Sequence, residues 1–268
     1  MRRGWFLPIA ATLGFAFLYL PILSLVVFSF NESRLVTVWS GFSTKWYGEL
    51  FADPQMLGAA RLSFIIAGIS ASIALVLGTL VAVALVRFKR FRGRTVLAGT
   101  VSAPLVMPDV ITGLALLLLF VAMEATLGWP AGRGIVTIII AHSTFCMAYV
   151  TVVVQSRLAD LDASLEEAAQ DLGATPVRVF FDITLPIIAP ALVSGWLLAF
   201  TLSLDDLVIA SFVSGPGSST LPMIIFSKVK LGVSPDVNAL ATIIIGIVAL
   251  GVFAATVIQL RSKPKKPA

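Results

Sequence analysis

The sequence predicts an all-α integral membrane protein that crosses the bilayer six times. Of its 268 residues, 58% are hydrophobic and only 12% are charged, and its mean hydropathy of +1.00 lies far above that of soluble globular domains. Uncharged runs of about 20 residues, enough for a helix to cross a hydrocarbon core of about 30 Å, recur along almost the whole chain. We therefore expect one membrane domain that covers residues 1–268.

Charge divides the expected spans into two groups. Four of them contain no charged residue, whereas the third contains Asp109 and the fifth contains Asp205 and Asp206. The six expected spans cover residues 5–30, 62–86, 96–120, 134–155, 188–212 and 237–260. The acids in the two remaining spans are therefore the first candidates for a functional role.

The distribution of Lys and Arg predicts the orientation of the spans, because cytoplasmic loops retain positive charge. With the N-terminus inside, 13 basic residues fall on the inside and six on the outside. Both termini are therefore expected in the cytoplasm, with the basic residues beside lipid headgroups. Despite the net charge of +5, this placement argues against nucleic-acid binding, which would need a basic patch with interleaved aromatic residues.

The connection between the fourth and fifth spans, residues 156–187, carries strong helix punctuation. Ser164 and Glu167 have the spacing of a capping box, and Gly173 stands where a helix C-cap belongs. A second helix is expected to start with Thr175 as N-cap and Pro176 in its first turn. Pro186 and Pro190 are expected to end or redirect it.

Two helices this short are not stable alone in water, so another surface must hold them. The small residues of the first helix and its end would let another backbone approach closely; they are Ala168, Ala169, Gly173 and Ala174. From the residues alone, the surface could belong to a partner or to the protein's own helix bundle. Both interpretations stay open at this point.

The residues EAAQDLGA, Glu167–Ala174, followed by ITLPIIAP, Ile183–Pro190, resemble the EAA loop of permease subunits in binding-protein-dependent ABC importers. The resemblance implies a type I ABC importer permease fold, MetI-like, in which this loop is a coupling helix that sits in a cleft of a cytoplasmic ATP-binding subunit. The residues it assigns to ATPase coupling are Glu167, Ala168, Ala169, Gly173, Ala174 and Pro186.

The same resemblance implies the partners of the chain. They are a dimer of ATP-binding subunits, a second homologous permease that forms a heterodimer with this chain, and an extracytoplasmic substrate-binding protein, all at a bacterial inner membrane. ATP and Mg would be bound by the ATPase subunits, and the chain has no Walker A motif, so no cofactor and no catalytic residue is expected in it.

The three acids of the third and fifth spans are expected in the outer half of the membrane. On continuous helices, Asp109 would lie about 20 Å and Asp205 about 26 Å from the inner end. Asp205 and Asp206 are about 100° apart on a helix, so they cannot face the same point. Without a Lys or Arg in the membrane to pair with, these carboxylates indicate a cationic cargo or a protonated state, although a structural hydrogen-bonded role stays open.

Two stretches around these acids, PLVMPDVITGLALLLLF (104–120) and FTLSLDDLVIASFVSGPG (200–217), resemble the spermidine/putrescine branch of the same permeases. This resemblance implies import of a linear polyamine. Two alternatives remain: an ABC permease for a metal ion, an oxyanion or another amine, and a self-sufficient proton-coupled secondary transporter that uses the same acids. His142 and Cys146, four residues apart, are too few for a metal site, so we expect His142 to be hydrogen-bonded in the packing and no metal to be bound.

Overall fold

The computed structural model describes residues 5–35, 38–88, 90–232 and 235–262. Over these residues the chain is helical, with one isolated bridge between Asn31 and Phe42. It divides into two compact units, residues 1–57 with 225–268 and residues 58–224, and the single domain expected over 1–268 stays a prediction. Several basic residues that predict the orientation lie outside the described residues, namely Arg2, Arg3, Lys89, Lys263, Lys265 and Lys266.

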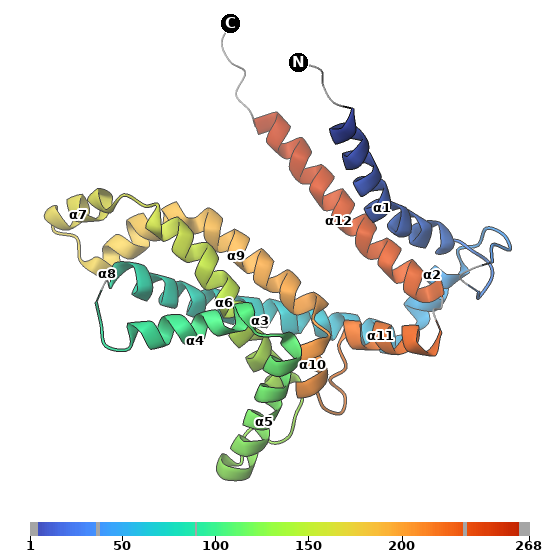
Figure 1. The fold of residues 1–268 in the computed structure, drawn as a ribbon, viewed down its shortest axis with the longest axis horizontal. Helices are drawn as coiled ribbons and strands as arrows, with labels where there is room; N and C mark the ends of the chain where they lie inside the picture. The colour runs from blue at the N-terminus through green and yellow to red at the C-terminus, as the bar shows by residue number, and fades with distance from the viewer. Residues whose placement is uncertain (1–4, 36–37, 89, 233–234, 263–268) are drawn as a thin grey trace, which may run out of the picture. The chain divides into compact units, whose positions relative to one another are not determined.

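The first unit contains the two ends of the chain (Figure 1). Its helices are α1 (Phe6–Phe28), α2 (Lys45–Ala52) and α12 (Pro235–Ser262), and α12 packs against the other two. Helices α3 (Pro54–Arg87) and α11 (Leu221–Leu231) belong to this unit at one end and continue into the second unit at the other.

Asn31 organises the connection between α1 and α2. Its fully buried amide donates to the Val38 carbonyl at 2.7 Å and accepts from the Ser40 amide at 3.0 Å, while its own carbonyl accepts from the Trp46 indole at 2.7 Å. Asn31 therefore satisfies polar groups on both sides of this connection through its side chain and its own carbonyl.

The second unit is built around α6 (Ile135–Ala159), the most buried long helix of the described chain. Its Val150 is fully buried and lies beside glycines of two neighbouring helices: a Cβ at Gly78 of α3 would meet Val150 at 2.8 Å, and one at Gly195 of α9 would meet it at 3.6 Å. The glycines allow α3 and α9 (Leu185–Asp205) to pack closely on α6.

Five helical segments of the described chain are long and apolar enough to cross a membrane. They are Phe6–Phe28, Pro54–Arg87, Asp109–Leu127, Ile135–Ala159 and Pro176–Asp205, and α12 adds a shorter apolar stretch, Pro235–Leu250. The predicted spans 5–30, 62–86, 134–155 and 237–260 therefore each correspond to one helix.

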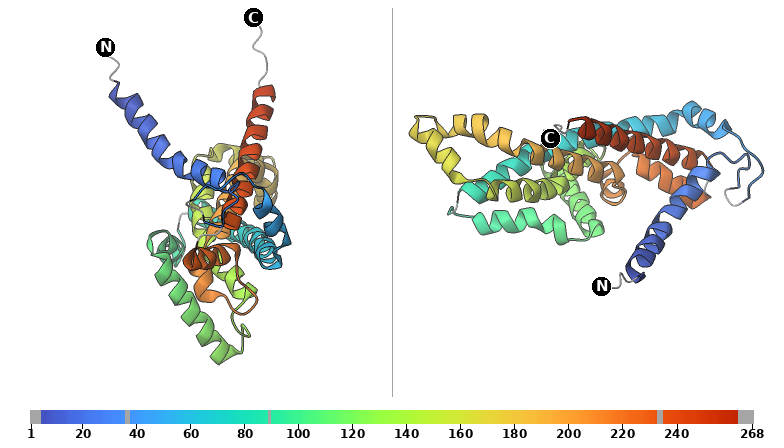
Figure 2. Two further views of the ribbon diagram at one scale, coloured as in Figure 1. Left: turned by 90° about the vertical axis from the view of Figure 1, so that its right-hand side faces the viewer. Right: turned by 90° about the horizontal axis from the view of Figure 1, so that it is seen from above.

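The prediction of one continuous helix over residues 96–120 is wrong. The chain forms α4 (Arg94–Val106), then extended backbone at Met107, then α5 (Asp109–Leu127); the two green helices run in clearly different directions in Figures 1 and 2. Pro108 explains the break, because a proline disfavours helical backbone in the residue before it. The estimate that Asp109 lies about 20 Å from the inner end of its span assumed a continuous helix and therefore does not hold.

The fifth predicted span, residues 188–212, is not one continuous helix either. The helix ends at Asp205, Asp206 is extended with φ −65° and ψ 124°, and a short helix α10 (Val208–Val213) follows. At its other end, the chain does not turn away at Pro186 or Pro190. Helix α8 (Pro176–Val179) continues through a π-helical turn, η1 (Phe180–Thr184), directly into α9. The wider turn accommodates prolines that cannot donate to the regular ladder.

Candidate functional site

The three acids predicted from the sequence all stand at helix breaks. Asp109 is in the first turn of α5 and is exposed, and Asp205 is the last residue of α9 and is also exposed. The side chain of Asp206, in the break between α9 and α10, is only 7% exposed. The breaks therefore separate two adjacent carboxylates into different surroundings.

A contact between α5 and α10 brings the two breaks close together. A Cβ at Gly113 of α5 would lie 2.7 Å from the ring of Phe212 and 3.4 Å from the Cα of Ile209, both in α10. Gly113 is four residues after Asp109, and Ile209 is three residues after Asp206. Each break is therefore only about one helical turn, roughly 5 Å, from the shared contact.

Asp206 is fully engaged by neighbouring groups. Its carboxylate accepts hydrogen bonds from the Ala210 amide at 2.7 Å, the Ile209 amide at 3.3 Å and the Nε2 of His142 at 3.1 Å. By contrast, neither Asp109 nor Asp205 pairs with a side chain of the described part of the chain. The geometry thus gives Asp206 a structural environment and leaves the other two carboxylates available to an external group.

The expected hydrogen-bonded role of His142 is confirmed. Its side chain is 1% exposed, and its Nδ1 lies 2.7 Å from the hydroxyl of Ser203. The thiol of Cys146 instead contacts the Ala199 carbonyl at 3.4 Å. No group of three or more metal-ligating side chains occurs among the described residues. Ser203 was not predicted, because a serine in an apolar helix gives no distinctive sequence signal.

The connection between α6 and α9 begins with α7 (Ala163–Asp171), whose N-cap is Asp162 rather than Ser164. The Asp162 carboxylate accepts from the Ser164 amide at 3.0 Å, and this hydrogen bond lowers the pKa of Asp162. The capping box predicted from Ser164 and Glu167 is therefore wrong. Asp162 caps the helix N-terminus instead, and its negative charge interacts favourably with the helix dipole.

The predicted end of this helix is confirmed. Gly173 has φ +87°, its amide donates to the Gln170 carbonyl at 2.8 Å, and the Ala174 amide donates to the Ala169 carbonyl at 3.0 Å. This pair of bonds is a Schellman motif, which needs a residue with left-handed backbone at this position. Thr175 and Pro176 then start α8 as expected.

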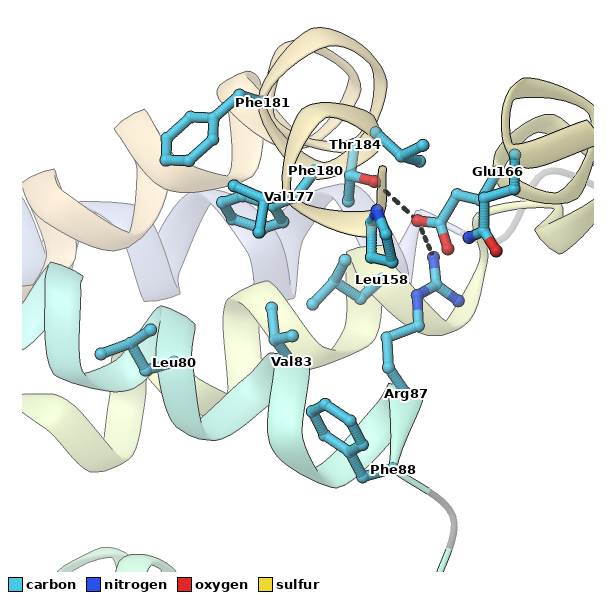
Figure 3. Close-up of a pocket in the computed structure, with 13 residues that line it drawn as sticks. Leu80, Val83, Arg87, Phe88, Leu158, Glu166, Val177, Phe180, Phe181 and Thr184 are labelled. Carbon is cyan, nitrogen blue, oxygen red and sulfur yellow. Dashed lines mark hydrogen bonds and ion pairs between the residues drawn. The ribbon is translucent and has the colours of Figure 1, made fainter. Parts of the chain in front are cut away.

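A cavity of about 540 Å³ lies between α7, α8 and the end of α3 (Figure 3). At its rim, Glu166 accepts from Arg87 at 2.7 Å and from the hydroxyl of Thr184 at 2.6 Å. Glu166 therefore joins α7 both to α3 and to η1, a role that was not predicted. Its neighbour Glu167 faces another direction and is exposed.

The remaining residues predicted for ATPase coupling differ in exposure. Ala168, Gly173 and Pro186 are exposed, whereas Ala169 and Ala174 are half-buried. Next to them stand large apolar side chains without cover: Leu172 is 90% exposed and Val177 is 67% exposed. Exposed apolar side chains beside a short helix that is anchored through Glu166 are typical of a surface that binds another protein.

Helices of membrane length, a connecting loop with an open apolar edge, and exposed carboxylates at adjacent helix breaks are the features of a multispan transport subunit. The chain belongs to the family of binding-protein-dependent transport system inner membrane components, whose profile matches residues 74–266. It is therefore a membrane permease component and not an enzyme, as expected from the loop sequence.

Two relatives match along almost the whole chain. The putrescine transport system permease protein PotI of Escherichia coli strain K12 is 60% identical over 99% of this chain and 94% of its own length. The spermidine/putrescine transport system permease protein PotC of the same strain is 43% identical over 99% of this chain and 96% of its own length.

A solved structure of a bacterial ABC transporter involved in the import of the acidic polysaccharide alginate contains a chain with the same fold. The TM-score is 0.71 at 19% identity, over 98% of this chain and 99% of that chain. The type I ABC importer permease fold expected from the resemblance is confirmed by this likeness.

Proposed function

We propose that this chain is the membrane permease of an ATP-driven importer that carries putrescine and spermidine across the bacterial inner membrane. The observation that carries the proposal is that Asp109 and Asp205, at two helix breaks joined by the contact of Gly113 with α10, have no side-chain partner among the described residues. The relatives named for putrescine and spermidine transport support the choice of cargo.

The chemistry of the carboxylates fits a linear polycation. Each ammonium group of a polyamine loses hydration when it enters the membrane, and a carboxylate without a fixed counter-ion can replace part of that hydration. Two such groups, one on each break, would let the cargo pass from one carboxylate to the next. Both acids are exposed, so each should bind an ammonium group weakly enough for the cargo to leave again.

In this proposal Asp206 belongs to the path through its support of the break rather than through direct contact with cargo. Its carboxylate already accepts from two backbone amides and His142. Binding a cation would compete with these hydrogen bonds. We therefore assign Asp109 and Asp205 to contact with the cargo and Asp206 to support of the break.

ATP hydrolysis would reach the spans through residues 163–187. The exposed surface of Glu167, Ala168 and Gly173, with Leu172 beside it, would dock into an ATP-binding subunit. Because α8, η1 and α9 form one continuous helical rod, a push on this surface would move the helix that ends at Asp205. The complete importer would contain a dimer of ATPase subunits that binds ATP and Mg, a second permease and an extracytoplasmic binding protein, with both termini of this chain in the cytoplasm.

The choice of cargo cannot rest on the fold, since a chain of an alginate importer has the same fold and its cargo is an acidic polysaccharide. It rests on the carboxylates. An anionic cargo would favour Arg or helix N-termini over two exposed Asp side chains. A self-sufficient secondary transporter would leave the exposed edge of α7 without a purpose.

Uptake of labelled putrescine and spermidine tests this proposal in cells that lack their own polyamine importers but contain the complete system. Asp109→Asn and Asp205→Asn are compared with the wild type at matched membrane levels, with Asp160→Asn as a control for loss of an exposed carboxylate outside the spans. We expect ATP-dependent uptake that falls about tenfold or more in the first two variants and is unchanged in the control. If the wild-type system moves neither polyamine, the cargo assignment is wrong.

A further inference from the structure

The imidazole of His142 bridges the two sides of the break between α9 and α10. On one side, its Nδ1 lies 2.7 Å from the hydroxyl of Ser203, in the last turn of α9. On the other side, its Nε2 lies 3.1 Å from the carboxylate of Asp206. Both contacts are made by a ring that is 1% exposed and projects from the central helix α6.

The protonation pattern of this cluster follows from its partners. An ionised carboxylate only accepts hydrogen bonds, so Nε2 of a neutral His142 carries the proton that is donated to Asp206. Nδ1 then accepts from the Ser203 hydroxyl. Asp206 in turn accepts from the amides of Ile209 and Ala210, which belong to the first turn of α10. One side chain of α6 therefore contacts both the last turn of α9 and the residue whose carboxylate accepts from the first turn of α10.

The far end of α10 is also tied to α6. The hydroxyl of Thr137 donates to the Val213 carbonyl at 2.6 Å. A six-residue helix has too few internal hydrogen bonds to be stable alone. Helix α10, which also packs against α5, is therefore tied to α6 by hydrogen bonds at both ends, through Asp206 to His142 at one end and to Thr137 at the other.

We propose that His142 is a positioning residue for cargo passage, which keeps Asp206 turned into the protein and so leaves Asp205 as the free carboxylate at the break. This inference rests on the proposed function for its consequence in transport, but the clamp itself does not depend on the cargo. Without the imidazole, the Asp206 carboxylate keeps only backbone partners at a site where its side chain is 7% exposed. The Asp206 carboxylate then competes with Asp205 for the same cation, or the backbone between α9 and α10 changes its conformation.

The decisive variants are His142→Leu, which removes both contacts at similar volume, and His142→Gln, whose amide can donate to Asp206 and accept from Ser203. Ser143→Ala is the matched control, because Ser143 is the neighbouring buried residue and its hydroxyl has no hydrogen-bond partner in the described part of the chain. All are measured in the complete importer, as polyamine taken up per ATP hydrolysed at matched membrane levels.

We expect His142→Leu to lower uptake per ATP about tenfold, the cost of removing a hydrogen bond to a buried charge. The half-saturating polyamine concentration should not change, because capture by the binding protein precedes this step. His142→Gln should retain most of the wild-type ratio and Ser143→Ala all of it. A variant that merely folded poorly would lower uptake and ATP hydrolysis together, leaving their ratio intact; that result for His142→Leu would overturn the proposal.

A second readout is independent of the cargo. Cys146 is the single cysteine of the chain, is fully buried, and lies one turn from His142 against α9. Its labelling by a maleimide, followed by mass spectrometry of this chain, should be several-fold faster in His142→Leu than in Ser143→Ala. If the wild type moves no polyamine, the proposed function fails, but faster labelling still supports the clamp and unchanged labelling rejects it.

Discussion

The guanidinium of Arg87, at the end of α3, lies 2.7 Å from the carboxylate of Glu166 in α7. The same carboxylate accepts from Thr184 in η1 at 2.6 Å. These contacts fix a nine-residue helix, too short to be stable alone, to two other elements of its unit. The anchor of this loop is therefore Glu166, one residue before the segment with the recognisable sequence.

Glu166→Gln should loosen α7 and reduce uptake several-fold. The pair is mostly buried, at 24% and 16% side-chain exposure, so removal of the charge should cost about 1–3 kcal/mol of docking. Asp182→Asn is the control, because it breaks an ion pair with Arg178 whose side chains are 61% and 75% exposed, which should contribute well under about 1 kcal/mol. Amide exchange in residues 163–171 measures the difference; equal exchange in both variants would contradict the assignment.

The left-handed glycine at the end of α7 gives a graded test. Gly173 has φ +87° and open space around its Cβ position, so backbone strain alone distinguishes the substitutions. Gly173→Asn should be tolerated, whereas Gly173→Val should cost about 1–2 kcal/mol and change the direction of the chain into α8. Co-purification of the ATP-binding subunit reports the effect. Identical recovery with Asn and Val would show that the loop conformation does not matter for docking.

Gly173→Asp and Glu167→Arg test the docking surface itself. Glu167 is exposed and Gly173 has open space around its Cβ position, so both variants should still insert, although Gly173→Asp adds backbone strain at φ +87°. A negative charge at the helix C-terminus is unfavourable, and a reversed charge at residue 167 opposes whatever basic group the partner presents. We expect both variants in the membrane without ATP-dependent uptake. Normal uptake with both changes present would remove the coupling assignment.

Local sequence signals predicted much of this architecture because they depend on neighbours in the chain. Hydropathy located the helices, and Gly173 and Thr175 with Pro176 located the loop helices, since caps and turns use residues within one turn. The two breaks were missed for different reasons. Pro108 is a local signal for the first break, whereas at the second break Asp206 is held by His142, a residue 64 positions away.

The candidate site shows the same division. The sequence identifies Asp109 and Asp205 as candidates because an acid in an apolar run is rare. It does not predict the role of Glu166, which depends on tertiary packing against Arg87. The role of Ser203 likewise depends on packing against His142. Distinguishing Asp205 from Asp206 likewise required the backbone at the break.

Lys228 of α11 predicts a pH dependence of stability in the first unit, since it pairs with Asp53 at 3.1 Å and with Asp236 at 2.6 Å. Burial would raise the pKa of Asp53, but hydrogen bonds from the Met56 amide and Lys228 outweigh it, so the pKa is lowered. Burial likewise opposes the charge of Lys228, yet its two carboxylate partners raise its pKa above the usual value.

The signs of these shifts define the pH range. The Asp53 contribution is present above the ordinary pKa of an aspartate and is lost as pH falls through its lowered value; the Lys228 contribution is present below the ordinary pKa of a lysine and is lost as pH rises through its raised value. Asp53→Asn should therefore lower thermal stability near neutral pH, by about 1 kcal/mol for a partly exposed pair. The difference from wild type should vanish in strong acid, whereas Glu49→Gln, an exposed acid on α2, should have no effect at either pH.

The contact between α5 and α10 predicts a large effect of a single methyl group. A Cβ at Gly113 would lie 2.7 Å from the ring of Phe212, closer than carbon atoms can approach, so Gly113→Ala must move α10 or the ring. Overpacking of this kind costs about 1–3 kcal/mol. Gly99→Ala in α4 is the matched control, because the same methyl group would meet nothing within 4 Å and should be neutral or slightly stabilising.

A compensating change separates the clash from other causes. Phe212→Leu removes ring atoms at the contact and should restore part of the uptake and thermal stability lost in Gly113→Ala. Because α10 starts at the break held by Asp206, displacement of Phe212 should also disturb the surroundings of Asp205, so uptake should fall more than the amount of assembled complex. If Gly113→Ala behaves like Gly99→Ala in both uptake and stability, the close approach of α5 and α10 is wrong, and with it the inference that the two carboxylate-bearing breaks lie together.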